Sequence, residues 1–172
     1  EYVKSGGNLL VTGYPVEERD PKKNLILQDV LGVRDTGKRT GGFIRVRGRG
    51  FQILCEGVNV RLSGARVVSY LMKNEDVTAK KWPAAVLHAT FGKGRAAYIP
   101  FNICTEYVNY RAPFVRDFIS EVLERLSPER PVKISGSRTV EIFLRSKGNA
   151  LLVHLINHAV GKEMEGTDWC VE

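Results

Sequence analysis

Residues 83–101, PAAVLHATFGKGRAAYIPF, hold the pattern that most constrains the fold, because two apolar stretches are separated by a short glycine-containing segment. The stretches cover residues 84–91 and 95–101, and Gly92-Lys93-Gly94 lies between them. Glycine adopts the positive φ angles that tight turns between antiparallel strands require. The pattern therefore predicts a β-hairpin.

The next segment, residues 112–128, has the apolar spacing of an amphipathic helix. Pro113 suits the first turn of a helix and Pro128 suits its end. The stripe that would face a core consists of Phe114, Val115, Phe118, Ile119, Val122, Leu123 and Leu126. A hairpin followed by such a helix is expected to bury the stripe against the strands.

The N-terminal residues 1–13, EYVKSGGNLLVTG, are typical of a helix end followed by a strand. Gly6-Gly7 would stop the helix, and Asn8 to Gly13 would form a short buried strand. A second short helix, with Leu27, Val30 and Leu31 on one face, is expected to end at Gly32. Helices that alternate with buried strands indicate an α/β domain.

Secondary-structure elements are harder to assign in the middle of the chain. Residues 34–50 are rich in glycine and arginine, and residues 51–72 form β-prone pieces separated by Gly57 and Gly64.

The apolar pattern changes to a period of two after about residue 131. Val140, Ile142 and Leu144 of TVEIFLR would share one face of a strand, SKGN would turn, and ALLVHLIN (150–157) would return. This predicts a second hairpin that opens an all-β, sandwich-like module. We therefore expect two domains, 1–130 and 131–172, with the boundary between residues 128 and 135.

The composition limits the classes of protein. The chain has 172 residues, 43% of them hydrophobic, which is enough for one globular domain and part of another. It has no apolar run of the roughly 20 residues that a membrane helix needs. The start has neither a signal-peptide layout nor an initiator methionine, so we expect the chain to begin inside something larger and to be cytoplasmic.

The two histidines His154 and His158 are spaced as a pair of zinc ligands would be on a helix. On the predicted strand, four residues span roughly 13 Å, which one metal ion cannot bridge. No HExxH motif and no Cys/His cluster supplies further ligands. We expect no metal ion and no cofactor.

A nucleophilic site would need a strained strand-to-helix elbow and a histidine held by an acid. Cys55, in ILCEG, lacks the glycine two residues earlier that the elbow requires, and none of the three histidines is followed two residues later by an acid. Carboxylates are numerous, but sequence spacing does not pair them as the acid and nucleophile of a glycosidase. We assign no catalytic residue.

The segment 34–50 has six Lys or Arg residues and one Asp, in a chain with a net charge of +7. Arg45 and Arg47 would share a strand face and could contact phosphates. Interleaved aromatic residues, which single-strand binders use, are missing. A solvated loop or an oligomer contact is the main interpretation, and a nucleic-acid-binding module through residues 34–49 is the alternative.

Taken in order, several pieces resemble one known family. EYVKSGGNLLVTG, LQDVLGV, FGKGRAAYIPF with its amphipathic helix, and TVEIFLRSKGNALLVHLINH resemble the C-terminal part of glycoside hydrolase family 42 β-galactosidases and related glycosidase-like proteins. The resemblance covers nearly the whole chain.

The resemblance implies an N-terminally truncated trimerisation domain with a flavodoxin-like, class I glutamine amidotransferase-like fold, followed by the start of a small β domain. In that family the two catalytic Glu residues lie on a (β/α)₈ barrel, which this chain lacks, so no catalytic residue carries over. The implied partners are an upstream barrel of the same protein, further copies in a homo-oligomer and the parent's carbohydrate substrate. Membrane and nucleic-acid partners are not expected.

The expected function is therefore assembly or support of a substrate site in a β-galactosidase-like protein, with a stand-alone hydrolase as another alternative. In open α/β sheets, loops after the carboxyl ends of strands shape sites. Thr12–Tyr14 and 102–111 occupy such places, and Tyr107 and Tyr110 would stack on a sugar or pack in an interface. The candidate site residues are Thr12, Tyr14, Asn102, Glu106, Tyr107, Tyr110 and Arg111.

Overall fold

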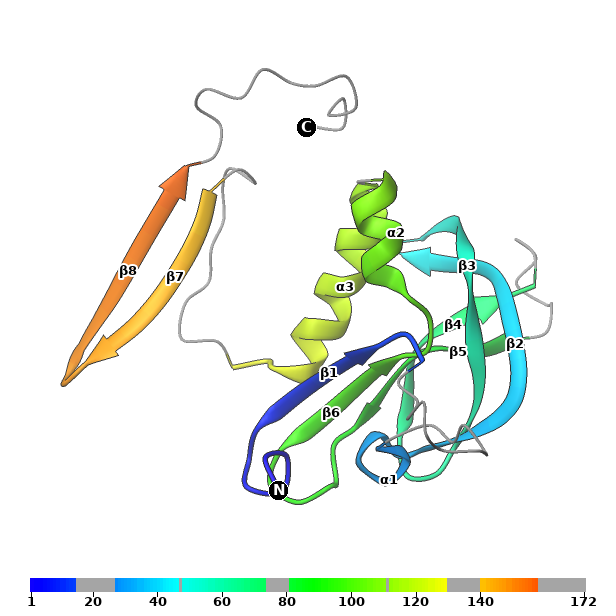
Figure 1. Ribbon diagram of the computed structural model, residues 1–172, viewed down its shortest axis with the longest axis horizontal. Helices are drawn as coiled ribbons and strands as arrows, with labels where there is room; N and C mark the ends of the chain where they lie inside the picture. Colours follow the sequence, from blue (N-terminus) through cyan, green and yellow to red (C-terminus); the bar gives the residue numbers. More distant parts are fainter. Residues whose placement is uncertain (15–26, 47, 74–80, 111, 130–139, 158–172) are drawn as a thin grey trace, which may run out of the picture. The chain divides into compact units, whose positions relative to one another are not determined.

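The computed structural model describes residues 1–14, 27–46, 48–73, 81–110, 112–129 and 140–157 (Figure 1). They belong to two compact units, residues 1–129 and residues 130–172. The first unit contains β1 (Asn8–Thr12), α1 (Gln28–Leu31), β2 (Val33–Val46), β3 (Arg49–Leu62), β4 (Arg66–Met72), β5 (Lys81–His88), β6 (Arg95–Ile99), α2 (Ile103–Tyr110) and α3 (Pro113–Leu126). The second unit contains β7 (Val140–Lys147) and β8 (Ala150–Asn157).

The strands of the first unit form one sheet in the order β1-β6-β5-β4-β2-β3. β1 and β6 run parallel, while every other described pair is antiparallel. The mixed α/β prediction is confirmed. The flavodoxin-like arrangement is not confirmed, because such a sheet is built from parallel strands with crossover helices, and the described residues contain one parallel pair.

The glycine- and arginine-rich segment causes most of this difference. Instead of a loop, residues 33–46 form β2, a strand of 14 residues that pairs with β3 on one side and with β4 on the other. Alternate side chains on it are apolar at the end next to β4, where Ile44 and Val46 are buried. The sheet therefore gains a long antiparallel hairpin.

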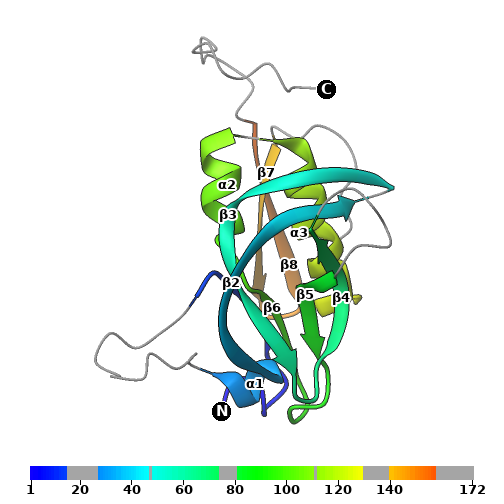
Figure 2. The same cartoon turned by 90° about the vertical axis from the view of Figure 1, so that its right-hand side faces the viewer.

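The long hairpin makes the sheet curl into a half-barrel, as β2 and β3 sweep around the other strands in Figure 2. The free edge of β3 meets the end of β6, where Gly57 forms an isolated bridge with Phe101. At this seam the Val58 amide donates a hydrogen bond of 2.7 Å to the Pro100 carbonyl. The contact covers part of an edge that would otherwise be open to other strands.

The core lies on both faces of β6 because successive side chains of a strand point to opposite faces. Ala97 and Ile99 pack in a cluster with buried residues of α3 such as Phe118. Ala96 and Tyr98 pack in a second cluster with Leu31 of α1. The two helices thus pack on opposite faces of β6.

Several local predictions are confirmed. The hairpin of β5 and β6 is antiparallel, with Val86 opposite Tyr98, and α3 begins with Pro113 in its first turn. At the N-terminus, Gly6 has φ 115° and the Gly7 amide donates to the Tyr2 carbonyl, which ends a helical turn as in a Schellman motif. α1 ends at Gly32, whose φ is 65°.

In the second unit, β7 and β8 form the predicted antiparallel hairpin, with a turn at Gly148, whose φ is 58°. The register places one set of side chains on a single face: Val140, Ile142, Leu144, Leu151, Val153 and Leu155. His154 lies opposite Phe143 on the other face. Residues 150–157 form the predicted strand, which includes His154, and His158 lies outside the described residues.

Candidate functional site

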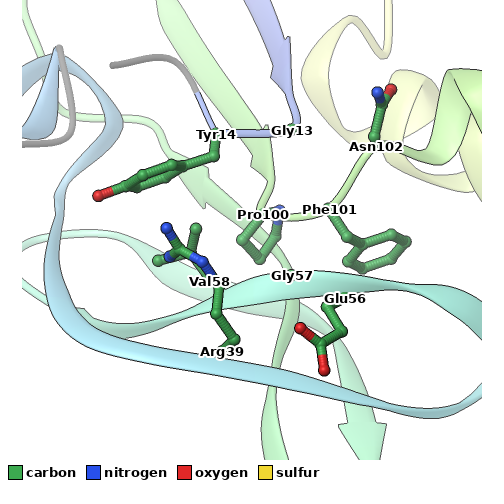
Figure 3. Close-up of a pocket in the computed structure, with 9 residues that line it drawn as sticks. All are labelled: Gly13, Tyr14, Arg39, Glu56, Gly57, Val58, Pro100, Phe101 and Asn102. Carbon is green, nitrogen blue, oxygen red and sulfur yellow. The ribbon is translucent and has the colours of Figure 1, made fainter. Parts of the chain in front are cut away.

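A pocket of about 240 Å³ opens where β1 and β6 end and the seam with β3 begins (Figure 3). Two chain segments that follow parallel strands, Gly13–Tyr14 and Pro100–Asn102, form one side of it. Arg39 of β2 and residues 56–58 of β3 form the other side. The pocket therefore lies at the carboxyl ends of the parallel pair, where open α/β sheets commonly bind ligands.

Two irregularities in the β2–β3 ladder bring Arg39 and Glu56 to this pocket. The register shifts between Asp35 and Arg39, and again between Thr40 and Gly42. Extra residues on one strand bend it and redirect its side chains, and such bulges are common beside active sites. The ladder between the shifts carries Arg39 opposite Val58, next to the seam.

Hydrogen bonds to the Asp35 carboxylate hold the first of these irregularities in place. Its Oδ1 accepts the amide hydrogen of Gly37 at 2.8 Å, and its Oδ2 accepts the hydroxyl hydrogen of Tyr14 at 2.6 Å. Nearby, the Thr36 hydroxyl donates to the Asn59 carbonyl at 2.6 Å. The bulged backbone is thus tied both to β3 and to the segment after β1.

Tyr14 also positions the guanidinium of Arg39. The guanidinium carbon lies 4.0 Å from the centre of the Tyr14 ring, a cation–π contact that Figure 3 shows at the side of the pocket. Burial raises the pKa of Tyr14, and Asp35 raises it further as acceptor and as negative charge, while Arg39 acts in the opposite direction. The phenol therefore stays protonated and continues to donate to Asp35 at neutral pH.

Gly13, which lines the pocket, is held by Tyr98, whose side chain is fully buried. Its hydroxyl donates to the Gly13 carbonyl at 2.9 Å. Burial raises the pKa of Tyr98 well above the usual value, and the negative charge of Asp35 adds to the effect. Gly13 is thereby held at φ 79°, a conformation that suits glycine.

We expect this buried phenol to make the protein less stable in alkaline solution. Above about pH 10 the unfolded chain loses the Tyr98 proton while the folded protein keeps it, so the free energy of unfolding falls as the pH rises. The contribution of one such group reaches about 1.4 kcal/mol per pH unit. Urea unfolding of wild type and of Tyr98→Phe between about pH 10 and 12 measures it. The variant should show the shallower pH dependence, and equal slopes would contradict the assignment.

The predicted site residues divide into two groups. Tyr14 and Asn102 line the pocket, and Thr12 lies just before it, with its Oγ1 3.8 Å from Cys104 Sγ. The Asn102 side-chain oxygen faces the Thr105 amide at 3.5 Å, at the start of α2.

The other predicted residues do not join this pocket. Residues 103–110 form the helix α2 rather than a loop, which corrects the expectation for residues 102–111. On this helix Glu106 is buried, and Tyr107 packs against the core cluster. Tyr110 is exposed and lines a separate hollow of about 180 Å³ with Leu54. Arg111 lies outside the described residues.

The sequence reading missed Arg39, Glu56 and Gly57 as pocket residues. One signal was present: an isolated glycine inside a β-prone segment marks a bulge or a close backbone approach. A Cβ at Gly57 would lie 2.6 Å from the Pro100 carbonyl oxygen and 2.8 Å from Phe101 Cβ. Gly57 is therefore a contact residue of the seam and not a separator between two strands.

Metal-binding groups are dispersed in the part of the chain that the structure describes, where no three His, Cys, Asp or Glu side chains form a cluster. His88 Nδ1 lies 2.8 Å from the Val30 carbonyl, a contact that ties β5 to the turn of α1. Cys104 is exposed and lies near Thr12. No helix within the described ranges has the length and apolar character to span a membrane.

The basic segment contributes to the sheet and to the pocket. Arg34 forms an ion pair of 2.7 Å with Asp29 of α1, and Arg39 lies on Tyr14. Arg45 is exposed on β2, and residue 47 lies outside the described residues. Binding of nucleic acid through residues 34–49 stays a prediction.

No family model matches the chain, and no curated protein matches it. The solved structure of Gan42B, a GH42 β-galactosidase, is similar to 91% of this chain, with 24% identity and a TM-score of 0.58. The catalytic mutant of Gan42B from G. stearothermophilus is similar to 91% of the chain with 22% identity and a TM-score of 0.55. In each case the match covers 23% of the β-galactosidase chain.

These comparisons show the fold alone, since both identities are below 25%. The chain spans less than a quarter of the β-galactosidase chains that it resembles. A third structure, the exo-β-1,4-mannosidase Op5Man5 from Opitutaceae bacterium strain TAV5, has 15% identity over 70% of this chain and 21% of its own. Its TM-score of 0.47 is too low to argue a shared fold.

Proposed function

We propose that this chain is a non-catalytic region of a longer, glycoside-hydrolase-type protein that resembles a β-galactosidase. The observation that carries the proposal is the extent of the fold match: 91% of this chain aligns with a segment that makes up 23% of a GH42 β-galactosidase. A whole region is matched while most of the enzyme lies outside it. Carbohydrate chemistry is therefore assigned to another part of the parent protein.

Within that proposal, the first unit corresponds to an N-terminally truncated, amidotransferase-like trimerisation domain, and residues 131–172 begin the β domain that follows it. Support comes from the parallel pair β1–β6, the β5–β6 hairpin and the helix α3, which occur in the order that the family resemblance implies. The role is to assemble copies of the parent or to support its substrate site.

The apolar face of the β7–β8 hairpin supports the proposal that residues 131–172 begin a β domain. Two strands alone are marginally stable in water, and six apolar side chains on one face need a covering layer. In a sandwich-like domain a second sheet supplies that layer.

Deletion of residues 1–172 from the parent tests the proposal. We expect light scattering to show a smaller assembly and the kcat/KM for a chromogenic galactoside to fall, because assembly and site support are lost. If the parent without residues 1–172 formed an assembly of the same subunit number and kept its kcat/KM, the proposed role in assembly or site support would be wrong. Glu124→Gln in the intact parent is the control, since Glu124 is exposed on α3 and should change neither.

The stand-alone hydrolase is tested with the purified chain. Our proposal predicts no turnover of the galactoside by residues 1–172 alone. Turnover that co-purifies with the folded chain and is lost in Glu56→Gln, the carboxylate at the pocket, would establish a hydrolase instead.

A further inference from the structure

The pocket at the seam has features that assembly of a parent protein does not explain. Two opposed register shifts flank Arg39 and Gly57, and side-chain hydrogen bonds from Tyr14 and Thr36 hold the irregular backbone. Irregular strand pairing costs stability, and bulges act as positioned features where they aim a side chain. In this structure the residues beside the shifts include Arg39 and Glu56, which both line the pocket.

The two charged groups of the opening are available to a ligand. The Arg39 side chain is exposed, and its guanidinium lies over the Tyr14 ring. Glu56 is exposed and makes no ion pair with another residue in the described part of the chain. A guanidinium donates hydrogen bonds in a fixed fork, and a carboxylate accepts them.

The balance of charge favours a neutral ligand. One guanidinium lies in the pocket with the Glu56 carboxylate, while the carboxylate of Asp35 lies behind Tyr14, within hydrogen-bond distance of its hydroxyl. An anion attracted by Arg39 would meet two negative groups, and like charges at short range oppose binding. A phosphate or carboxylate group is therefore disfavoured.

The hydrogen-bonding groups favour several hydroxyls. The Arg39 guanidinium and the Asn102 side-chain amide can donate hydrogen bonds, and the Glu56 carboxylate can accept them. A hydroxyl both donates and accepts, so a ring with several hydroxyls satisfies such a mixed set. The cavity of about 240 Å³ is smaller than the roughly 300–1,000 Å³ of sites for drug-sized molecules, which limits the occupant to one small ring.

We propose that this pocket binds a single neutral, polyhydroxylated sugar unit, with Arg39 and Glu56 as its charged hydrogen-bonding groups and Asn102 beside them. The choice of a sugar among neutral polyols rests on the proposed function. The ligand lies between the segments that follow β1 and β6 on one side and the β2–β3 hairpin on the other, and the Tyr14–Asp35 pair positions Arg39.

The test is a titration of the purified 172-residue chain followed by ¹H–¹⁵N NMR. Galactose, glucose and mannose are the neutral probes, and glucuronate and inorganic phosphate are the anionic probes. We expect at least one neutral sugar to bind with a dissociation constant of about 1–10 mM, the range for a ligand with few atoms. The shifted amides should be those of Gly13, Gly57, Val58 and Asn102.

Variants separate this site from binding elsewhere. Glu56→Ala and Arg39→Ala should each weaken the sugar at least tenfold, because each removes a hydrogen bond to a charged group. Glu124→Ala and Arg66→Ala are matched controls at exposed positions outside the pocket, and they should change the affinity less than twofold. Thermal unfolding of all four variants should resemble that of wild type, since none of the four side chains is buried.

Three results would overturn the proposal. The first is no amide shift at 100 mM of any neutral probe, a concentration at which a site with a dissociation constant of about 10 mM would be mostly filled. The second is a set of shifts that map outside the pocket, and the third is tighter binding of glucuronate or phosphate than of every neutral sugar. None of these would affect the proposed assembly role, which the deletion from the parent tests. Conversely, if the deletion experiment disproved the assembly role while the chain still bound a sugar, the inference about the pocket would be unaffected.

Discussion

Substitution of Gly57 by alanine is expected to lower the free energy of unfolding of the first unit by about 2–3 kcal/mol, the upper range for a methyl group forced into a packed site. The new Cβ would lie 2.6 Å from the Pro100 carbonyl oxygen and 2.8 Å from Phe101 Cβ. The backbone cannot move away without loss of the 2.7 Å hydrogen bond between the Val58 amide and Pro100. Urea unfolding followed by circular dichroism measures the change.

Gly41→Ala is the matched control for this seam variant. Gly41 also lies in the β2–β3 hairpin, but a Cβ there would meet nothing within 4 Å and its φ is not in the positive range. We expect a change within about 0.5 kcal/mol. If both alanine variants lost the same stability, β3 would not close against the end of β6. The seam variant should also remove the pocket, since Gly57 lines it.

Truncation of Phe118 to alanine is expected to have the largest effect, a loss of about 3–5 kcal/mol in the free energy of unfolding. Phe118 is completely buried on α3, and its ring lies 6.1 Å from that of Phe101 between ring centres. Removal of the ring leaves a cavity between α3 and the strands that end at the pocket. Thermal or urea unfolding of the purified chain measures the loss.

Leu123→Ala on the same helix is the control for Phe118→Ala. Leu123 is 37% exposed, so its truncation removes less buried area and should cost about 1 kcal/mol or less. Equal losses for the two variants would mean that α3 does not pack on the sheet through the face described above. Both substitutions lie on the same helix, and the gain in helix propensity on replacement by alanine is roughly a few tenths of a kcal/mol at each site, which is small beside the expected difference.

The parts of the fold that the sequence predicted well are those built from local contacts. Val86 and Tyr98 pair across a short connection, and the stripe of α3 repeats within one continuous segment. Turn glycines and a period of 3.6 or 2 are visible in any such window. The same holds for β7 and β8, whose turn contains Gly148.

The β2–β3 hairpin was not predicted because its determinants are not local. Glycines at 37, 41 and 42 indicate a loop, whereas the bulged ladder is held by Asp35 and Thr36 through contacts with Tyr14 and Asn59. Tertiary contacts override strand propensity in such cases. The helix α2 was missed for a related reason, since its eight residues include Thr105 and Val108, which have low helix propensity.

Half of the candidate pocket followed from a general rule and half did not. Tyr14 and Asn102 were expected because they follow strands, and carboxyl ends of parallel strands shape sites. Arg39 and Glu56 come from an antiparallel hairpin that reaches the pocket only when the sheet curls. The sequence pattern does not predict that the sheet curls, so it gives no reason to place residues 14, 39, 56 and 102 together.

The central claim is that this chain is a region of a longer glycoside-hydrolase-type protein. The most direct measurement is the sequence of the transcript upstream of the codon for Glu1. Our account predicts an open reading frame that continues upstream and encodes a (β/α)₈ barrel with two glutamates at the carboxyl ends of its strands. An initiator methionine codon directly before Glu1 would contradict it.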